Sequence, residues 1–227
     1  VLSLTNDKKL IKELPSTSVL AFGLMINLLK NIFVSFESVK KKQWDYSSFV
    51  GQEIASSTIG IIGLGRIGGS IAKKFSPFSR NIGFYDPYIP NGFEKVNGIL
   101  KYKYLSELLK NSDIVSINTP LNKETKGMVN KDFLSQMRKG SYLINLSRGP
   151  IVENKNLILE KLLVNHLEGY GTDVWTNEPP LEDDQLNIAW KENKNNLKGR
   201  LIVNPHTAYF SEEALYESRS KACLTCL

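Results

Sequence analysis

The sequence has 227 residues, of which 41% are hydrophobic, with 16 glycines and 9 prolines. A chain of this length and apolar content can bury the core of one or two domains, which excludes a disordered or repeat protein. The formal net charge of +6 comes from scattered lysines without a basic stripe interleaved with aromatic residues, so no nucleic-acid binding is expected.

The first part of the chain predicts a domain remnant followed by a helix. The chain starts without methionine in the apolar run "VLSL", and residues 1–13 are expected to be the remnant of a domain lying mostly before Val1. The stretch "PSTS" at 15–18 is typical of a helix start, and one long helix is expected over about 16–42.

The apolar part of this predicted helix, residues 19–34, suggests a buried helix and no membrane span. Asn27, Lys30 and Asn31 interrupt it before it reaches the roughly 20 apolar residues that a span needs. Its apolar residues cover too much of the surface for a single interface. We therefore expect the helix to pack on its own domain and on a second copy in a homodimer.

From Thr58 onward, short apolar runs alternate with helical patterns. The runs are 58–63, 81–86, 113–118, 141–147, 169–175 and 200–205, and the helical patterns lie near 66–75, 104–110, 130–137, 154–164 and 211–222. Unbroken apolar strands that alternate with helices indicate a parallel sheet covered on both faces. The predicted fold is an α/β doubly wound parallel sheet, the Rossmann dinucleotide-binding architecture, over residues 14–206.

A glycine fingerprint follows the first run and opens a helical pattern, which is the context that makes such a motif informative. Gly63 permits a tight turn, Gly65 lets the backbone approach a pyrophosphate, and Gly68 lets the helix pack against the strand. Arg66 and Ile67 are expected at the helix N-terminus, whose free N–H groups suit phosphates.

The next run ends in "FYDPY", where Asp86 lies near the spacing expected of a ribose-binding acid. A carboxylate there accepts hydrogen bonds from the ribose 2′-hydroxyl and repels a 2′-phosphate. The predicted cofactor is therefore NAD in preference to NADP. The simpler alternative is an aspartate that caps a turn before Pro87.

Chemically active side chains follow the later runs. Ligands of doubly wound sheets lie outside the carboxyl ends of the strands, where Thr119-Pro120, Arg148, Asp173, Glu178 and His206 are expected. Such a set suits a dehydrogenase of 2-hydroxy acids, because histidine exchanges a proton near neutral pH, a carboxylate orients its ring and arginine binds a substrate carboxylate. Each residue taken alone has an ordinary structural explanation, and their convergence favours the functional one.

Five blocks occur in the order and spacing of the D-isomer-specific 2-hydroxyacid dehydrogenase family, which the chain resembles from about Pro15 to its end. They are "GIIGLGRIG", "FYDPY", "INLSRGPIVEN", "GTDVWTNEPP" and "NPHTAYFSEEA". By this resemblance, Arg148 looks like the substrate-binding arginine, Glu178 like the acid paired with the histidine, and His206 like the general acid/base. Asp173 looks like the residue that holds the nicotinamide carboxamide. Further cofactor contacts are expected from Thr119, Pro120, Thr125, Leu146 and Ser147.

The resemblance implies an NAD-dependent oxidoreductase that interconverts a 2-oxo acid and a D-2-hydroxy acid. It also implies a second, flavodoxin-like substrate domain, of which residues 1–13 and a C-terminal helix within 207–227 are remnants. Because most of that domain is missing here, this chain is expected to bind NAD(H) but to turn over poorly. Two blocks are also similar to the C-terminal-binding-protein corepressors, a branch of the family, so an NAD-sensing scaffold is the alternative.

The remaining features are interpreted as structural. His166 lies at a predicted helix end, far from the ligand edge. Cys223 and Cys226 form a single C-x-x-C pair, which is weak evidence for zinc, so no metal site is expected. Sparse cysteine use and the absence of a signal peptide at the start predict a cytoplasmic protein. Asn118 stands where the family commonly has histidine, and the choice among 2-hydroxy acids is left open.

Overall fold

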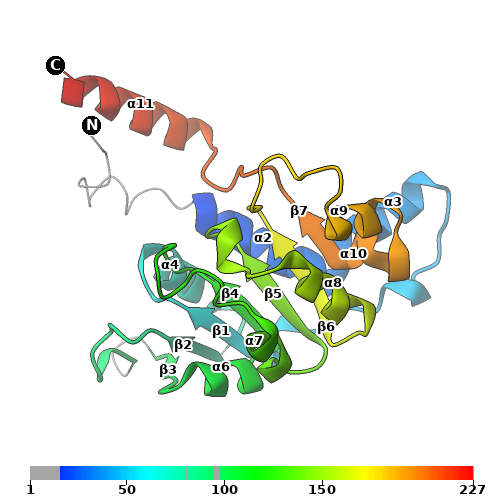
Figure 1. Cartoon of the computed structure of the whole chain (residues 1–227), viewed down its shortest axis with the longest axis horizontal. Helices are drawn as coiled ribbons and strands as arrows, with labels where there is room; N and C mark the ends of the chain where they lie inside the picture. Colours follow the sequence, from blue (N-terminus) through cyan, green and yellow to red (C-terminus); the bar gives the residue numbers. More distant parts are fainter. Residues whose placement is uncertain (1–15, 80, 95–97, 227) are drawn as a thin grey trace.

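The computed structural model describes residues 16–79, 81–94 and 98–226, so the predicted remnant over 1–13 lies outside the described residues. A seven-stranded sheet forms the centre of the molecule, with strand order β3-β2-β1-β4-β5-β6-β7 (Figure 1). All its pairings are parallel. The strands are β1 (Ile59–Ile62), β2 (Ile82–Tyr85), β3 (Leu100–Lys101), β4 (Ile114–Ile117), β5 (Ser141–Asn145), β6 (Leu167–Thr172) and β7 (Leu201–Val203).

The predicted doubly wound parallel sheet is confirmed, including all six strands expected from the apolar runs. Strand β3 was missed because it has only two residues, and Leu100 within it is exposed. The helices after the first two described ones are α4 (Arg66–Phe75), α6 (Leu105–Asn111), α7 (Lys131–Gln136), α8 (Lys155–Leu163), α9 (Gln185–Lys191), α10 (Leu197–Arg200) and α11 (Glu212–Cys226).

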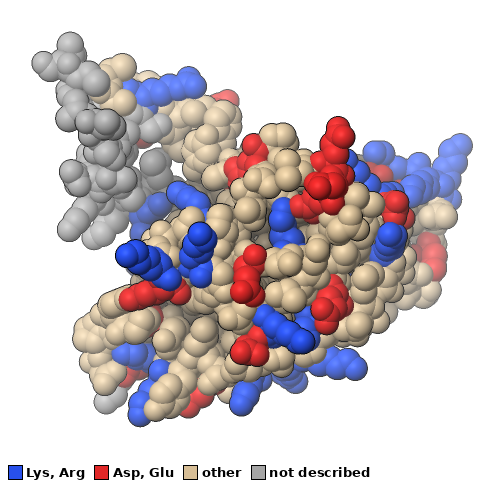
Figure 2. All heavy atoms as spheres, viewed as in Figure 1, with Lys and Arg blue, Asp and Glu red and all other residues tan. Residues whose placement is uncertain are grey.

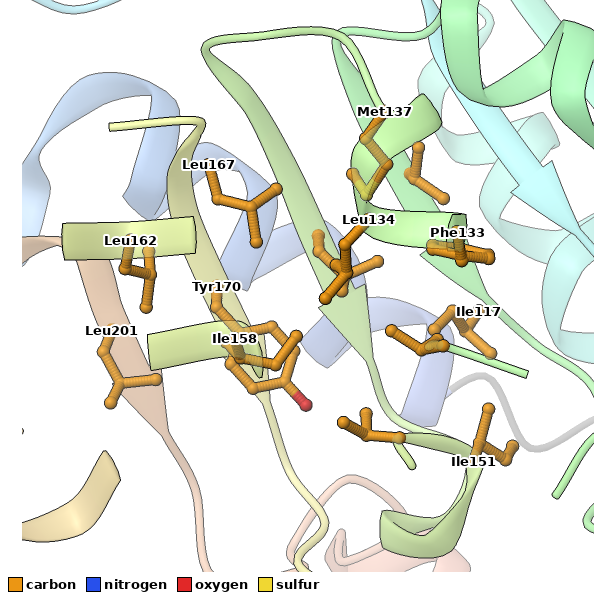
Figure 3. Close-up of a cluster of buried hydrophobic side chains, with 14 of the residues drawn as sticks. Ile117, Phe133, Leu134, Met137, Ile151, Ile158, Leu162, Leu167, Tyr170 and Leu201 are labelled. Atoms are coloured by element: carbon orange, nitrogen blue, oxygen red, sulfur yellow. The ribbon is translucent and has the colours of Figure 1, made fainter. Parts of the chain in front are cut away.

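Successive side chains along each strand point to opposite faces of the sheet and pack into two hydrophobic cores, one on each face. Ile61 and Ile144 point to the face covered by α2 (Ser16–Lys30) and α4, whereas Ile62 and Leu143 point to the other face. On that other face, side chains of α7 and α8 pack against β4, β5 and β6 (Figure 3). Because both faces are covered, the strands read as unbroken apolar runs in the sequence.

The single helix predicted over about 16–42 is wrong: the chain forms α2 and a separate α3 (Ile32–Lys40), bent by 64°. Asn31 between them adopts a left-handed conformation with φ 53°, which asparagine tolerates better than most residues. Asn31 Nδ2 donates to the Val50 carbonyl, and Asn27 Oδ1 accepts from the Phe33 N–H. Local side-chain bonds therefore replace the helical ones at the break.

The two helices differ in burial. Helix α2 packs on α4, β5 and β6 and buries Leu24, Met25 and Leu28, whereas no residue of α3 is buried. Across the described ranges no single helix is long and apolar enough to cross a membrane; only α2 and α3 taken together pass that test.

The last helix, α11, extends away from the sheet (Figure 1) and covers the helical pattern predicted near 211–222. Its predicted return to a substrate domain stays a prediction. On the face shown in Figure 2, lysine and arginine side chains lie interspersed with aspartate and glutamate and form no continuous basic stripe there.

Candidate active site

The register of the sheet brings the expected site residues to one edge. Tyr85, Ile62, Ile117, Asn145, Thr172 and Val203 lie at the same level across six neighbouring strands. The residues that follow them therefore leave the sheet side by side: Asp86, Gly63, Asn118, Leu146, Asp173 and Asn204. In doubly wound sheets this carboxyl edge is where ligands bind.

The glycine loop between β1 and α4 is shaped for a ligand that approaches the backbone. Gly63 has φ +84°, and a Cβ there would lie 2.9 Å from the Asn118 carbonyl oxygen. A Cβ on Gly68 would lie 2.2 Å from the Gly63 carbonyl oxygen, so the helix and the turn touch directly. A Cβ on Gly65, by contrast, would meet nothing within 4 Å and would occupy the open space in front of α4.

The helix that this loop opens points the N–H groups of its first turn toward that space. Gly65 is the N-cap of α4 and has no capping side chain, Arg66 and Ile67 form its first turn, and no acidic residue lies there. N–H groups and a helix dipole facing an open space beside glycine fit a dinucleotide pyrophosphate.

Asp86 is fixed at the same place by the loops on either side of it. Its Oδ2 accepts a hydrogen bond from the Leu64 N–H at 2.9 Å, and its Oδ1 accepts one from the Tyr88 N–H at 2.9 Å. The carboxylate therefore lies beside the glycine loop in a fixed orientation, where it can accept a hydrogen bond from a hydroxyl of a bound ribose. It also caps the turn after β2, which confirms the capping interpretation. Its contact with a ribose stays a prediction.

The loop after β4 closes the other side of the glycine turn. The buried Oγ1 of Thr119 has no hydrogen-bond partner, while its methyl group faces Gly63. A buried hydroxyl without a partner fits a polar group of the cofactor. Thr125 differs from the expectation, because its hydroxyl already donates to the Pro120 carbonyl at 2.5 Å and accepts from the Asn122 N–H. Its hydroxyl organises the loop.

The loop after β5 carries Arg148. Ser147 Oγ donates to the Ile117 carbonyl at 2.9 Å, and Leu146 is buried. Asn145, fully buried, holds the turn on both sides: its Oδ1 accepts from the Ser147 N–H and its Nδ2 donates to the Arg148 carbonyl. Arg148 itself is exposed, which leaves most of its guanidinium donors for an anionic ligand.

Asp173 has a structural task that the sequence interpretation did not foresee. It is 1% exposed, and its two oxygens accept hydrogen bonds from the N–H groups of Thr207 and Ala208, at 2.8 and 2.7 Å. It therefore ties the end of β6 to the segment that carries His206. The expected contact with a nicotinamide carboxamide stays a prediction.

His206 and Glu178 form the one acid–histidine pair of the described residues. Nδ1 of His206 lies 2.7 Å from Oε2 of Glu178, and both side chains are about two-fifths exposed. His206 has φ 54°, an uncommon left-handed conformation held by the Asp173 contacts to the next two residues. With Nδ1 engaged by the acid, Nε2 is the ring nitrogen left for a substrate.

The environment of Glu178 keeps it ionised. Burial raises the pKa of its carboxyl, but hydrogen bonds from the Trp175 N–H (2.8 Å) and from His206, with the charges of His206 and Arg148, outweigh burial and hold the pKa below its usual value. An ionised Glu178 stabilises a protonated His206 ring. The electrostatic influence of Arg148 on Glu178 also places the predicted arginine, acid and histidine in one neighbourhood.

Other residues of this edge were not expected. Asn145 and Trp175 lie inside the blocks "INLSRGPIVEN" and "GTDVWTNEPP", but the sequence assigned them no role. Lys155 and Asp184, which contact Trp175, lie outside all the quoted blocks. His166, interpreted as structural, has Nε2 2.9 Å from the Leu134 carbonyl oxygen, away from this edge.

Comparison with known protein families gives one match over most of the chain. Residues 22–208 match the model of the D-isomer specific 2-hydroxyacid dehydrogenase, NAD binding domain. The chain is 36% identical over 199 residues to a D-3-phosphoglycerate dehydrogenase of Bacillus subtilis, covering 88% of this chain and 36% of that protein. The chain therefore spans well under two thirds of this relative.

Solved structures give the same result. D-lactate dehydrogenase from Aquifex aeolicus, complexed with NAD and lactic acid, superposes with a TM-score of 0.84 and 27% identity, over 95% of this chain and 66% of that one. NAD-dependent formate dehydrogenase from Staphylococcus aureus, in complex with NAD, superposes with a TM-score of 0.81 and 30% identity, over 94% and 62%.

Proposed function

The chain belongs to the D-isomer-specific 2-hydroxyacid dehydrogenases, as their NAD-binding domain, and we propose that the complete protein interconverts a 2-oxo acid and a D-2-hydroxy acid. The observation that carries this proposal is the His206–Glu178 pair, joined at 2.7 Å on the same sheet edge as the glycine loop. A proton-transferring pair beside a dinucleotide site is what reduction of a carbonyl requires.

The roles of the side chains follow from their positions. When bound, NAD(H) would supply or accept the hydride. Nε2 of protonated His206 donates a proton to the carbonyl oxygen as it becomes a hydroxyl, and takes it back in the reverse direction. Glu178 holds the ring through Nδ1 and stabilises its charge. Arg148 binds the substrate carboxylate and so orients the carbonyl toward His206.

The experiment that tests this function is a panel of 2-oxo acids assayed with the complete protein. Oxidation of NADH is followed at 340 nm, and the product is analysed for the D-isomer. We expect at least one 2-oxo acid to be reduced at a rate that saturates with its concentration. Tight NADH binding without turnover on any of them would instead support the alternative, an NAD-sensing scaffold of the corepressor type. The similar proteins are dehydrogenases and reductases, which favours the enzyme.

Asp86 is expected to set the preference for NADH. Replacing it with Asn removes a charge-assisted acceptor for the ribose, which should weaken NADH binding by about 10-fold and narrow the preference over NADPH. Fluorescence titration of both dinucleotides measures this. Asp132→Asn, an exposed aspartate on α7, is the control and should change neither affinity. An unchanged NADH-to-NADPH affinity ratio in Asp86→Asn would contradict the assignment.

We further propose that the protein is a homodimer through α3 and the segment that follows it. This surface exposes the apolar residues Ile32, Phe33, Phe36 and Val39 of α3, and Trp44, which is 86% exposed. Isolated exposed apolar residues are normal, but four of them on one nine-residue helix, with Trp44 shortly after it, indicate an interaction site. A second copy is the occupant that fits, because a self-complementary apolar surface is what a two-fold dimer buries.

Light scattering coupled to size exclusion tests the dimer. We expect a mass twice that of the chain, and Phe36→Glu should shift the population to monomer because it buries a charge in the interface. The matched control is Val164→Glu at the end of α8, equally exposed but outside this surface. A wild-type chain that stays monomeric at micromolar concentration would contradict the proposal.

A further inference from the structure

A largely buried ion pair contacts Trp175, three residues before Glu178, and touches none of the reacting groups. Lys155 at the start of α8 binds Asp184, the N-cap of α9, and their side chains are only 16% and 9% exposed. In no other ion pair of the described residues are both side chains so buried. Asp184 Oδ1 also accepts from the Asn187 N–H at 3.0 Å.

Trp175 connects this ion pair to the site. Its indole Nε1 donates to Asp184 Oδ2 at 2.8 Å, and the Lys155 ammonium lies 4.3 Å from the centre of its ring. Trp175 is 5% exposed and belongs to the core shared by β4, β5 and β6. The side chain is thus held by a hydrogen bond at its rim, a cation over its face and apolar packing elsewhere.

The backbone of Trp175 in turn contacts the catalytic segments. Its N–H donates to Glu178 Oε1 at 2.8 Å, while the other oxygen of Glu178 binds His206. A Cβ added to Gly149 would lie 2.1 Å from the Trp175 carbonyl carbon, so the residue after Arg148 packs directly on this backbone. The position of one tryptophan therefore affects the acid and the arginine-bearing turn.

Opposite charges stabilise the Lys155–Asp184 pair, which we call the anchor of Trp175. Burial raises the pKa of Asp184, but its hydrogen bonds with Lys155, Asn187 and Trp175 outweigh burial and lower the pKa. Asp184 is therefore ionised, and its charge is compensated by the Lys155 ammonium. A neutral side chain at either position would leave the other charge buried without its partner.

We propose that Asp184 and Lys155 are positioning residues for the His206–Glu178 pair. They hold Trp175 so that its backbone N–H meets Glu178, and Glu178 then orients the imidazole. This inference rests on the proposed function for its catalytic meaning, but the contacts that carry it are independent of any turnover.

The test uses variants that disturb the anchor without touching the catalytic pair. Trp175→Phe keeps an aromatic side chain but removes the indole N–H, and Asp184→Asn removes the charge while retaining an N-cap acceptor. The matched control is Asp113→Asn. Asp113 also pairs with a cation, Arg138 at 2.7 Å, and accepts a backbone N–H, that of Thr58 at 2.8 Å. It lies at the opposite edge of the sheet, at the start of β4.

The first readout is the ionisation of Glu178. In 15N-labelled protein the ring signals of His206 shift when Glu178 loses its proton, and the only other histidine, His166, serves as an internal reference. In the wild-type chain the Trp175 N–H and His206 hold the pKa of Glu178 below its usual value. In Trp175→Phe and Asp184→Asn this pKa should rise, because Glu178 loses the well-placed Trp175 N–H. Asp113→Asn should leave it in place.

The second readout is the kinetics of the complete protein. We expect both anchor variants to lower kcat by about 10-fold, with the KM for NADH unchanged and the acidic limb of the pH profile moved upward. Thermal unfolding identifies the folded variants, and Trp175→Phe decides the question if Asp184→Asn does not fold.

The outcomes separate the two hypotheses. If folded Trp175→Phe has the same Glu178 pKa and the same kcat as Asp113→Asn, the positioning role is wrong, while the proposed dehydrogenase function is unaffected. If the complete protein reduces no 2-oxo acid but the pKa of Glu178 still rises in the anchor variants, the proposed function is wrong and the positioning role is supported.

Discussion

Replacing His206 with Gln in the complete protein is expected to lower kcat by about 10²–10⁴-fold, the usual contribution of a positioned general acid/base. Glutamine approximates the size of histidine but cannot exchange a proton, so the carbonyl oxygen receives its proton only from water. Because the ring contacts Glu178 and not the glycine loop, NADH affinity should stay within about twofold. Stopped-flow hydride transfer and a fluorescence titration of NADH measure the two quantities separately.

The second histidine of the chain provides the control. His166→Gln changes the same side chain at a place where Nε2 contacts only the Leu134 carbonyl, and kcat should be unchanged. A second variant, Glu178→Gln, tests the pair: it retains an oxygen for Nδ1 but no charge to stabilise the protonated ring. It should lower kcat less than His206→Gln. A kcat for His206→Gln close to that of the wild type would contradict the role of His206 as general acid/base.

Three neighbouring glycines are expected to give three different results when each becomes alanine. In Gly65→Ala the methyl group enters the open space in front of α4, so the fold is kept but NADH binding weakens by about 10- to 100-fold, because the pyrophosphate loses hydrogen bonds to backbone N–H groups. In Gly68→Ala the methyl group meets the Gly63 carbonyl, and the free energy of unfolding falls by about 1–3 kcal/mol.

Gly69→Ala completes the series as its control. Nothing lies within 4 Å of a Cβ there, and the residue is inside α4, so alanine should raise the free energy of unfolding by up to about 1 kcal/mol. NADH affinity should not change. Urea unfolding and calorimetric titration with NADH measure both effects for all three variants. If Gly65→Ala binds NADH as tightly as Gly69→Ala, the pyrophosphate does not lie on this loop.

The sequence predicted the fold well wherever structure follows from a local pattern. Six apolar runs became strands because a strand covered on both faces needs mostly apolar residues, and that requirement is visible in the three to six consecutive residues of each strand. The break at Asn31 was missed because the residues on both sides read as one helix. Asn27 and Asn31 act there through side-chain bonds to neighbouring backbone groups, which a hydrophobic pattern does not contain.

For the site, the sequence alone determined which residues emerge at the ligand edge, since the ends of parallel strands must meet there. Arg148, Glu178 and His206 were predicted in this way, and Gly63 and Asp86 were predicted from the glycine fingerprint and its spacing. Only the tertiary structure decided how they are held: that Asp173 binds the N–H groups after His206, and that Trp175 aims Glu178 while Lys155 and Asp184 anchor it. These partners come from separate loops and helices, and a hydrogen bond depends on distance and direction, which packing sets and sequence spacing does not.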